Sequence, residues 1–429
     1  MVRADSADKA GSALFKRFKI NATPTILFLD ASGAEIDWIV GYDLPADVFH
    51  EKMLKIPAGI DTYRVLAAAY AKNPKDVPTV FKLALKWGDR YDEAKSKEFF
   101  QAVIALDPQG TTGPYRVEPD GLEVPYTEYA EYQIGYNSVM TMKPDPASMR
   151  AFIAKYPDSK LLKQAYQTLS FAYSYQGTKE ESAKFFEEYA GKFPNDPKVL
   201  DMWLARINRD KGPFDKGAEL AARIRALTRS NPVRGYNKDV AELYANRNET
   251  AKIEDVYGKS FMEGQATALA IDLIEYAQFW AGRDANKDSA LEMVETAMRL
   301  KPDFLYIIQQ GASVLIKLGR EDKAMEVFGP AWLAKNGDKS TNQYSYGAFW
   351  SGQGKNMDAA LAALRKAIAT DPDKYYYWSG LATALQKVKK WDEAVQAAEK
   401  AVALADDQIK PAMRASLERI KTAQAADKK

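Results

Sequence analysis

The segments Met357-Asp358-Ala359-Ala360-Leu361 and Trp391-Asp392-Glu393-Ala394-Val395 share one pattern of acidic, small and apolar residues, and they lie 34 residues apart. The apolar positions that follow keep this offset; they are Leu364, Ala367 and Ile368 in the first copy and Ala398, Ala401 and Val402 in the second. Apolar residues three and four positions apart share one face of a helix, so each copy predicts an amphipathic helix. A repeat of about 34 residues is typical of two antiparallel helices. The two segments therefore predict a tandem array of helix pairs.

The same anchor, a small residue ahead of an apolar stripe, recurs upstream at intervals of 35, 33, 39, 34, 36 and 34 residues. The anchors are Ala183, Ala218, Ala251, Ala290, Ala324, Ala360 and Ala394. Proline disfavours helix in the residue before it, and prolines follow the predicted second helices at Pro108, Pro232, Pro302 and Pro372. The chain is therefore predicted to be mainly α, with a helical solenoid over residues 61–425. Its last two units resemble tetratricopeptide (TPR) repeats, and the earlier units resemble degenerate members or generic helical hairpins.

One interval of the array is too long for a single repeat. Ala94 and Ala147 continue the anchors toward the N-terminus, but 53 residues separate them. That leaves about 19 residues beyond one repeat of about 34. The excess falls on residues 107–127, where prolines and glycines forbid a regular helix, and this predicts a loop insertion. A long ordered loop is often a binding element, whereas a disordered insertion is the alternative, and the sequence leaves both open.

Ahead of the array lies an apolar stretch from Phe18 to Asp30, followed by Gly33, Trp38 and Gly41-Tyr42. This stretch resembles the second half of a thioredoxin domain, which carries a cis-proline, two antiparallel strands and the last helix. The resemblance implies a truncated α/β thioredoxin-like remnant over residues 1–56. Strands are expected at residues 26–29 and 35–40, a helix at 45–54, and a hinge at 55–60.

The resemblance also implies a binding site. In thioredoxin-like proteins the proline at the position of Pro24 is cis, and the residue before it pairs with a bound polypeptide. By resemblance, Thr23 and Pro24 would line a substrate groove. The cysteine pair of the family lies upstream of the matched stretch, and this chain contains no cysteine. The remnant is therefore expected to be redox-dead, with Thr23-Pro24 as an inherited structural turn.

An alternative concerns the start of the chain. If the natural protein begins about 60 residues earlier, the missing half would carry a Cys-x-x-Cys motif. The chain would then be a fragment of a bacterial thioredoxin-family thiol-disulfide oxidoreductase, or of a thioredoxin–TPR chaperone that holds unfolded clients. Exported homologues of this architecture imply a periplasmic location, with the cytoplasm as the alternative. The truncated remnant is expected to be less protected from hydrogen exchange than residues 290–405, unless the first solenoid helices cover it.

Composition excludes several classes of function. Sixty Lys and Arg against 58 Asp and Glu give a net charge of +2, which is too balanced for an electrostatic grip on nucleic acid. No apolar run approaches the about 18 residues of a membrane span. The one histidine, His50, has no partner at a metal-binding spacing, and cysteine is absent. We therefore expect no cofactor, no metal site and no enzymatic activity.

The remaining site candidates are aromatic residues on the first helices of the last two units. They are Tyr344, Tyr346, Phe349, Trp350, Tyr375, Tyr376, Tyr377 and Trp378. First helices line the concave face of such a solenoid, so Tyr344, Trp350, Tyr377 and Trp378 would form a peptide groove. Packing between helices is the competing explanation for this spacing. The sequence thus predicts a protein–protein interaction module that binds a protein or peptide, and it leaves the partner's identity and the oligomeric state open.

Overall fold

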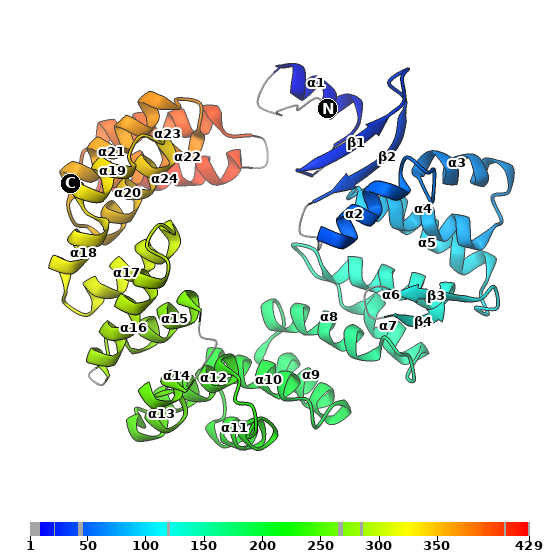
Figure 1. Ribbon diagram of the computed structural model, residues 1–429, viewed down its shortest axis with the longest axis horizontal. Helices are drawn as coiled ribbons and strands as arrows, with labels where there is room; N and C mark the ends of the chain where they lie inside the picture. Colours follow the sequence, from blue (N-terminus) through cyan, green and yellow to red (C-terminus); the bar gives the residue numbers. More distant parts are fainter. Residues whose placement is uncertain are drawn as a thin grey trace. The chain divides into compact units, whose positions relative to one another are not determined.

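The computed structural model describes residues 9–20, 22–41, 46–117, 121–264, 269–283, 286–406 and 409–427. The chain divides into two compact units, Met1–Asn231 and Pro232–Lys429, rather than at the hinge expected over residues 55–60. Each unit consists mainly of packed helix pairs, so the prediction of a mainly α, TPR-like fold is confirmed (Figure 1). None of the helices in these described ranges is long and apolar enough to cross a membrane.

The first unit begins with a short α/β segment and continues as helix pairs. Its elements are α1 (Lys9–Arg17), β1 (Thr25–Leu29), β2 (Glu35–Val40), α2 (Ala46–Lys55), α3 (Tyr63–Lys72), α4 (Val77–Asp89), α5 (Glu93–Leu106), β3 (Pro114–Val117), β4 (Leu122–Pro125), α6 (Tyr126–Val139), α7 (Ala147–Lys155), α8 (Leu162–Tyr175), α9 (Lys179–Lys192), α10 (Pro197–Asp210) and α11 (Phe214–Leu227). Within each pair the neighbours pack on one another, α4 on α5, α6 on α7, α8 on α9 and α10 on α11. Capping side chains fix several helix starts, among them Asp76 for α4 and Asp92 for α5.

The second unit is entirely helical in its described residues. Its elements are α12 (Arg234–Ala245), α13 (Thr250–Tyr257), α14 (Lys259–Glu263), α15 (Ala270–Trp280), α16 (Lys287–Leu300), α17 (Leu305–Lys317), α18 (Glu321–Phe328), α19 (Pro330–Asn336), α20 (Ser340–Gln353), α21 (Met357–Thr370), α22 (Tyr375–Lys387), α23 (Trp391–Leu404) and α24 (Lys410–Asp427). Helix α16 ends two residues before Pro302 and α21 two residues before Pro372, as the proline positions predicted. The final helix, α24, packs against α23 and contributes Leu417 and Ile420 to the core.

Two second helices of this unit are broken at a glycine. Gly258 separates α13 from α14, and a Cβ atom there would lie 2.3 Å from the carbonyl oxygen of Glu254. Gly329 separates α18 from α19 in the same way, with the carbonyl oxygen of Met325 at 2.0 Å from a Cβ. Contacts this short exclude any side chain, because the carbonyl belongs to the preceding helical turn. Both breaks therefore require glycine.

Each break leaves a carbonyl that a tryptophan of the next helix satisfies. Trp280 Nε1 donates to the Tyr257 carbonyl at 3.1 Å, and Trp350 Nε1 donates to the Phe328 carbonyl at 2.7 Å. Both indoles are fully buried, and the two tryptophans lie 70 positions apart. The arrangement repeats after two helix pairs rather than one, so a period of about 70 residues overlies the period of about 34.

The N-terminal hairpin of β1 and β2 is anchored to the first helices of the array. The strands pair antiparallel, and Trp38 of β2 is buried. Its ring lies 4.9 Å from that of Tyr63 on α3 and 5.8 Å from that of Trp87 on α4, centroid to centroid. Two ion pairs join β2 to α4 and to the residue that caps its end; they are Lys86–Asp37 at 2.6 Å and Arg90–Glu35 at 2.5 Å. Helices α3 and α4 thus cover the hairpin, which is why the hinge does not divide the chain.

The insertion predicted at residues 107–127 contains the β3–β4 hairpin. Tyr115 is paired with Val124, and Val117 with Leu122. Asp107 holds the start of the insertion, because its carboxylate accepts hydrogen bonds from the backbone N–H groups of Thr111 and Thr112, at 2.8 and 2.9 Å. The insertion is therefore an ordered element in its described residues.

Candidate functional site

The two residues assigned by resemblance, Thr23 and Pro24, lie at the surface just before β1. The peptide bond between them is cis, and both side chains are exposed. The N–H of Gly41 donates to the carbonyl of Pro24 at 2.9 Å, which ties the turn to the end of β2. Their place in a substrate groove stays a prediction. His50 is exposed on α2, and the described residues contain no group of three or more side chains suited to a metal ion.

Of the four aromatic residues predicted to form a peptide groove, two lie in the core of the second unit. Trp350 and Tyr377 are fully buried, which corrects that part of the prediction: both pack between helices, where a bound peptide cannot touch them. Tyr344 is half-buried and stacks on Tyr377, with 5.0 Å between ring centroids. Trp378 is also half-buried, but it borders an open groove.

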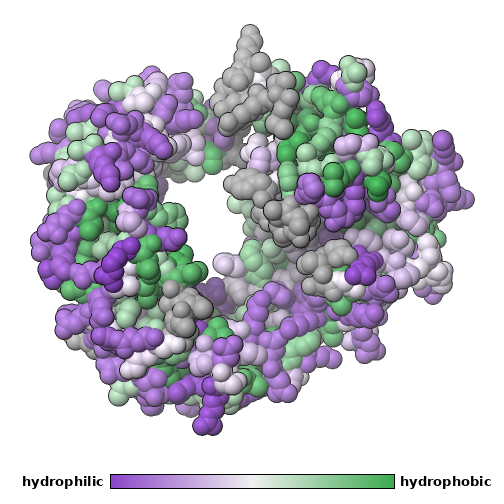
Figure 2. All heavy atoms as spheres, viewed as in Figure 1, coloured by the Kyte–Doolittle hydropathy of each residue, from purple (hydrophilic) through white to green (hydrophobic). Residues whose placement is uncertain are grey.

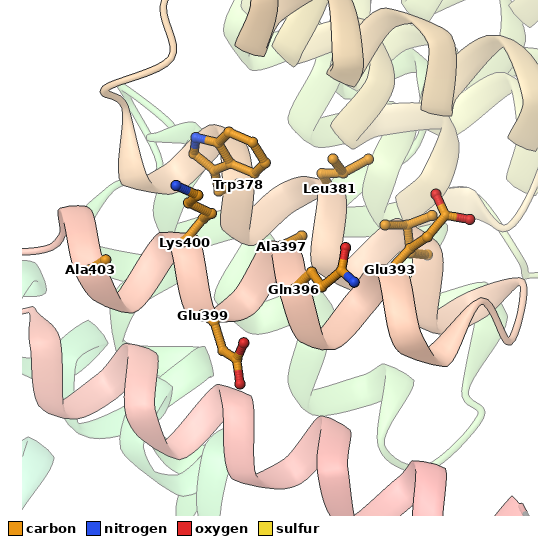
Figure 3. A pocket seen from close by; sticks show the side chains of 9 residues that line it. Trp378, Leu381, Glu393, Gln396, Ala397, Glu399, Lys400 and Ala403 are labelled. Atoms are coloured by element: carbon orange, nitrogen blue, oxygen red, sulfur yellow. The ribbon is translucent and has the colours of Figure 1, made fainter.

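The groove beside Trp378 lies between α22 and α23 and has a volume of about 620 Å³. Figure 3 shows Trp378 and Leu381 of α22 facing Ala397 and Lys400 of α23 across it. The indole Nε1 of Trp378 donates to the Pro372 carbonyl at 2.7 Å, so the ring is held by its own preceding turn. This groove offers one aromatic side chain among mixed charges.

A second groove, of about 650 Å³, lies in the first unit between α4 and α6. Successive tyrosines of helix α6 lie three, three and four positions apart, so they share one face of the helix; they are Tyr126, Tyr129, Tyr132 and Tyr136. The β3–β4 hairpin adds Tyr115, whose ring centroid lies 4.9 Å from that of Tyr129. We call this hollow, lined by residues of β2, α4 and α6 and of the segments between them, the tyrosine groove.

Four large apolar side chains are exposed in the tyrosine groove. They are Ile60, Tyr91, Tyr136 and Met140, with 52%, 62%, 38% and 43% of their surface exposed. Single exposed apolar residues are ordinary, whereas a group of them in one hollow marks a binding surface. Figure 2 shows hydrophobic residues at the surface over the β2 and α3 region, with hydrophilic residues around them.

Charged groups line the α4 side of the tyrosine groove. Lys86 Nζ binds Asp37 Oδ2 at 2.6 Å, and Lys82 Nζ binds Asp61 Oδ1 at 2.8 Å. The other oxygen of Asp37 is buried, and no hydrogen-bond donor of the described residues reaches it. The groove thus combines apolar anchors with a few polar positions, as peptide and ligand sites do.

Tyr129, whose ring contacts that of Tyr115 in this groove, is expected to make stability fall at high pH. Burial raises the pKa of Tyr129 to about 12, the nearby Tyr115 adds to the rise, and a hydrogen bond from Gln133 opposes it. In the unfolded chain the phenol ionises near pH 10, so its contribution is complete below pH 10 and is lost as the pH rises toward 12. The loss is at most about 3 kcal/mol for two pKa units. Tyr129→Phe should remove this part of the pH dependence in urea unfolding measured at pH 9 and above pH 11.

Exposed Tyr175 supplies the control for that measurement. Tyr175→Phe removes the same hydroxyl from a side chain that is 71% exposed, so it reports the effect of the substitution itself. The lysines and the other tyrosines titrate in both variants, so the difference between the two variants isolates the part of the pH dependence that Tyr129 causes. Identical slopes for Tyr129→Phe and the original chain would contradict the burial of the Tyr129 phenol.

Sequence reasoning did not single out the tyrosine groove. The three-and-four spacing of the α6 tyrosines is visible in the sequence, but tyrosine is only weakly apolar, so the stripe gives little contrast between the faces of the helix. Ile60 and Tyr91 join the stripe only through the tertiary fold. A search for tyrosines at helical spacing would have found only Tyr136 among the four exposed side chains of the groove.

No family model matches the chain, and no curated protein matches it. Among solved structures, it is similar to a tetratricopeptide repeat protein from Parabacteroides merdae ATCC 43184, with 14% identity and a TM-score of 0.35, over 56% of this chain and 90% of that one. It is similar to YrrB, a TPR protein with an unusual peptide-binding site, with 13% identity and a TM-score of 0.25, over 55% and 97% of the two chains. The MamA protein has 16% identity and a TM-score of 0.31, over 43% and 96%. At these TM-scores the likenesses carry no conclusion about sites or partners.

Proposed function

We propose that this chain is a protein–protein interaction module that binds a peptide segment of a partner in the tyrosine groove. The observation that carries the proposal is the gathering of Ile60, Tyr91, Tyr136 and Met140, all exposed, in one hollow of about 650 Å³. Tyrosine and methionine are enriched at interfaces, since tyrosine combines a large apolar ring with a polar tip and methionine adapts its shape. A hollow of this size lies within the range of about 300–1,000 Å³ of known ligand sites.

In this proposal the thioredoxin-like remnant is a structural wall without redox chemistry. The order of strand, turn, strand and helix over residues 25–55 supports the resemblance, and β2 contributes Asp37, Trp38 and Ile39 to the groove. An oxidoreductase role would need thiols, and this chain contains no cysteine. In this proposal the remnant contributes to function by forming one wall of the peptide-binding groove.

Selection of peptides on the full chain tests the proposal. A displayed library of random peptides should yield binders that carry an aromatic or aliphatic anchor. Replacing Tyr136 and Met140 together by alanine should weaken these peptides by about tenfold or more, because buried aromatic anchors carry about 2 kcal/mol at interfaces. Fluorescence anisotropy with the selected peptides measures the change.

The chain offers matched controls for both substitutions. Tyr175→Ala and Met142→Ala remove the same residue types from side chains that are 71% and 99% exposed and that do not line the groove. These variants should bind the selected peptides unchanged. An equal loss in the control pair, or a library that yields no binders, would refute the tyrosine groove as the site.

A further inference from the structure

A third hollow, of about 740 Å³, lies near the contact between the β1–β2 hairpin and the end of α4. It shares no lining residue with the tyrosine groove. Its walls come from the end of α1, from residues 18–20 and from the start of α5, with Tyr63 and Trp87 between them. Five cations line it, and they are Lys16, Arg17, Lys19, Arg90 and Lys95. The two carboxylates in the lining are Glu35 and Asp92. We call this hollow the basic groove.

The carboxylates of the basic groove are already engaged. Glu35 forms an ion pair with Arg90 at 2.5 Å, inside the attachment of the hairpin. Asp92 caps α5 and accepts a hydrogen bond from the backbone N–H of Lys95 at 3.1 Å. Within the described ranges, Lys16 and Lys19 form no ion pair. Arg17 and Lys95 likewise form no ion pair with a described residue. The ammonium of Lys95 lies over the Trp87 ring, 3.8 Å from its centroid.

This concentration of charge is unusual for the chain. The whole chain carries +2, yet five cations and two carboxylates give this one hollow a net charge of +3. The C-terminus of α1 offsets only about half a charge. Lys16, Arg17 and Lys19 are all exposed, so their charges reach an occupant of the groove. Like charges held together cost stability unless a counter-charge arrives, which points to an anionic ligand.

We propose that the basic groove docks an acidic segment of a partner protein. Charge complementarity selects an anionic occupant, and a concave hollow with Phe15 and Tyr63 in its lining suits a peptide that carries an apolar side chain among its carboxylates. Nucleic acid fits less well, because Trp87 packs against Trp38 and Tyr63 and its face is covered by Lys95, so it offers no platform on which a base can stack. The site is independent of the tyrosine groove.

Anisotropy of a fluorescein-labelled peptide of glutamates, aspartates and two phenylalanines, titrated with the full chain, tests the docking. We expect binding that weakens with added salt, because the cations are exposed. The triple variant Lys16→Glu, Arg17→Glu and Lys19→Glu should weaken binding by about tenfold or more, and Lys95→Glu alone should weaken it by several fold. Tyr136→Ala with Met140→Ala should not change it.

A charge-matched control separates a docking site from general attraction. Lys198, Lys366 and Lys374 are exposed and do not line the groove, so their triple change to glutamate alters the net charge equally. The control should bind the acidic peptide within about twofold of the original chain. The proposal is overturned if the control weakens binding as much as the groove variant, if the acidic peptide does not bind, or if an oligothymidylate of equal length binds more tightly. Melting curves by circular dichroism confirm that each variant is folded.

Discussion

Replacing Arg90 by alanine is expected to release the β1–β2 hairpin from α4, at a cost of about 3–5 kcal/mol. The guanidinium is nearly buried, pairs with Glu35 at 2.5 Å and donates to the carbonyl of Phe18. It also lies 4.3 Å from the centroid of the Trp38 ring. Alanine would leave the half-buried Glu35 carboxylate and the buried Phe18 carbonyl without their donor. The free-energy cost of leaving such groups unpaired exceeds that of losing an ordinary surface contact.

Hydrogen exchange of residues 25–40 measures this release directly. A loss of 3 kcal/mol corresponds to a decrease in protection of about a hundredfold. Arg64→Ala is the matched control, because Arg64 pairs with Asp30 of the same hairpin at 2.8 Å but is half exposed. The control should cost less than about 1 kcal/mol. Equal protection of the hairpin in both variants would contradict the anchoring role of Arg90.

Replacing Trp350 by alanine is expected to destabilise the second unit by about 3–5 kcal/mol. Trp350 is fully buried, its ring lies 5.1 Å from that of Phe349, and its Nε1 donates to the carbonyl of Phe328. Alanine would leave a cavity and a buried carbonyl without a donor. Trp350→Phe keeps most of the volume and loses the hydrogen bond, so it should cost about 1–3 kcal/mol. Urea unfolding followed by circular dichroism gives these values.

Trp378→Ala removes the same side chain from a half-buried position beside an open groove. Its cost should be less than half that of Trp350→Ala, since solvent already occupies one side of the ring. The comparison separates the two interpretations that the aromatic residues left open in the sequence. Equal destabilisation by the two substitutions would mean that Trp378 is a core residue as well.

The array itself was predictable because its signal is local and repeated. The offset of 34 residues between Ala360 and Ala394 places equivalent helices, and prolines such as Pro372 place their ends. The offset alone does not separate the two tryptophans, because the burial of their counterparts is known only from the structure. Trp350 corresponds to Ala384, which is fully buried, whereas Trp378 corresponds to Tyr344, which is half-buried. The distinction between the core tryptophan and the groove tryptophan therefore comes from the fold and not from the repeat spacing.

The attachment of the hairpin and the two grooves of the first unit were not predictable in this way. Trp38 finds its cover in Tyr63 and Trp87, and these contacts join residues that are 25 and 49 positions apart without any repeat to relate them. The net charge of the whole chain likewise hid the basic groove, because carboxylates elsewhere cancel its cations. Such features depend on tertiary packing, on which periodicity carries no information.

The paired breaks at Gly258 and Gly329 restrict how this chain can change in length during evolution. Each indole must meet the carbonyl that a broken helix exposes one hairpin earlier, so a single hairpin is not interchangeable with its neighbour. The smallest piece that duplication or deletion can add or remove, while keeping every tryptophan beside its acceptor, is therefore a block of two hairpins. The tryptophan-to-carbonyl hydrogen bond therefore sets the length of chain that recombination within the gene can gain or lose at once.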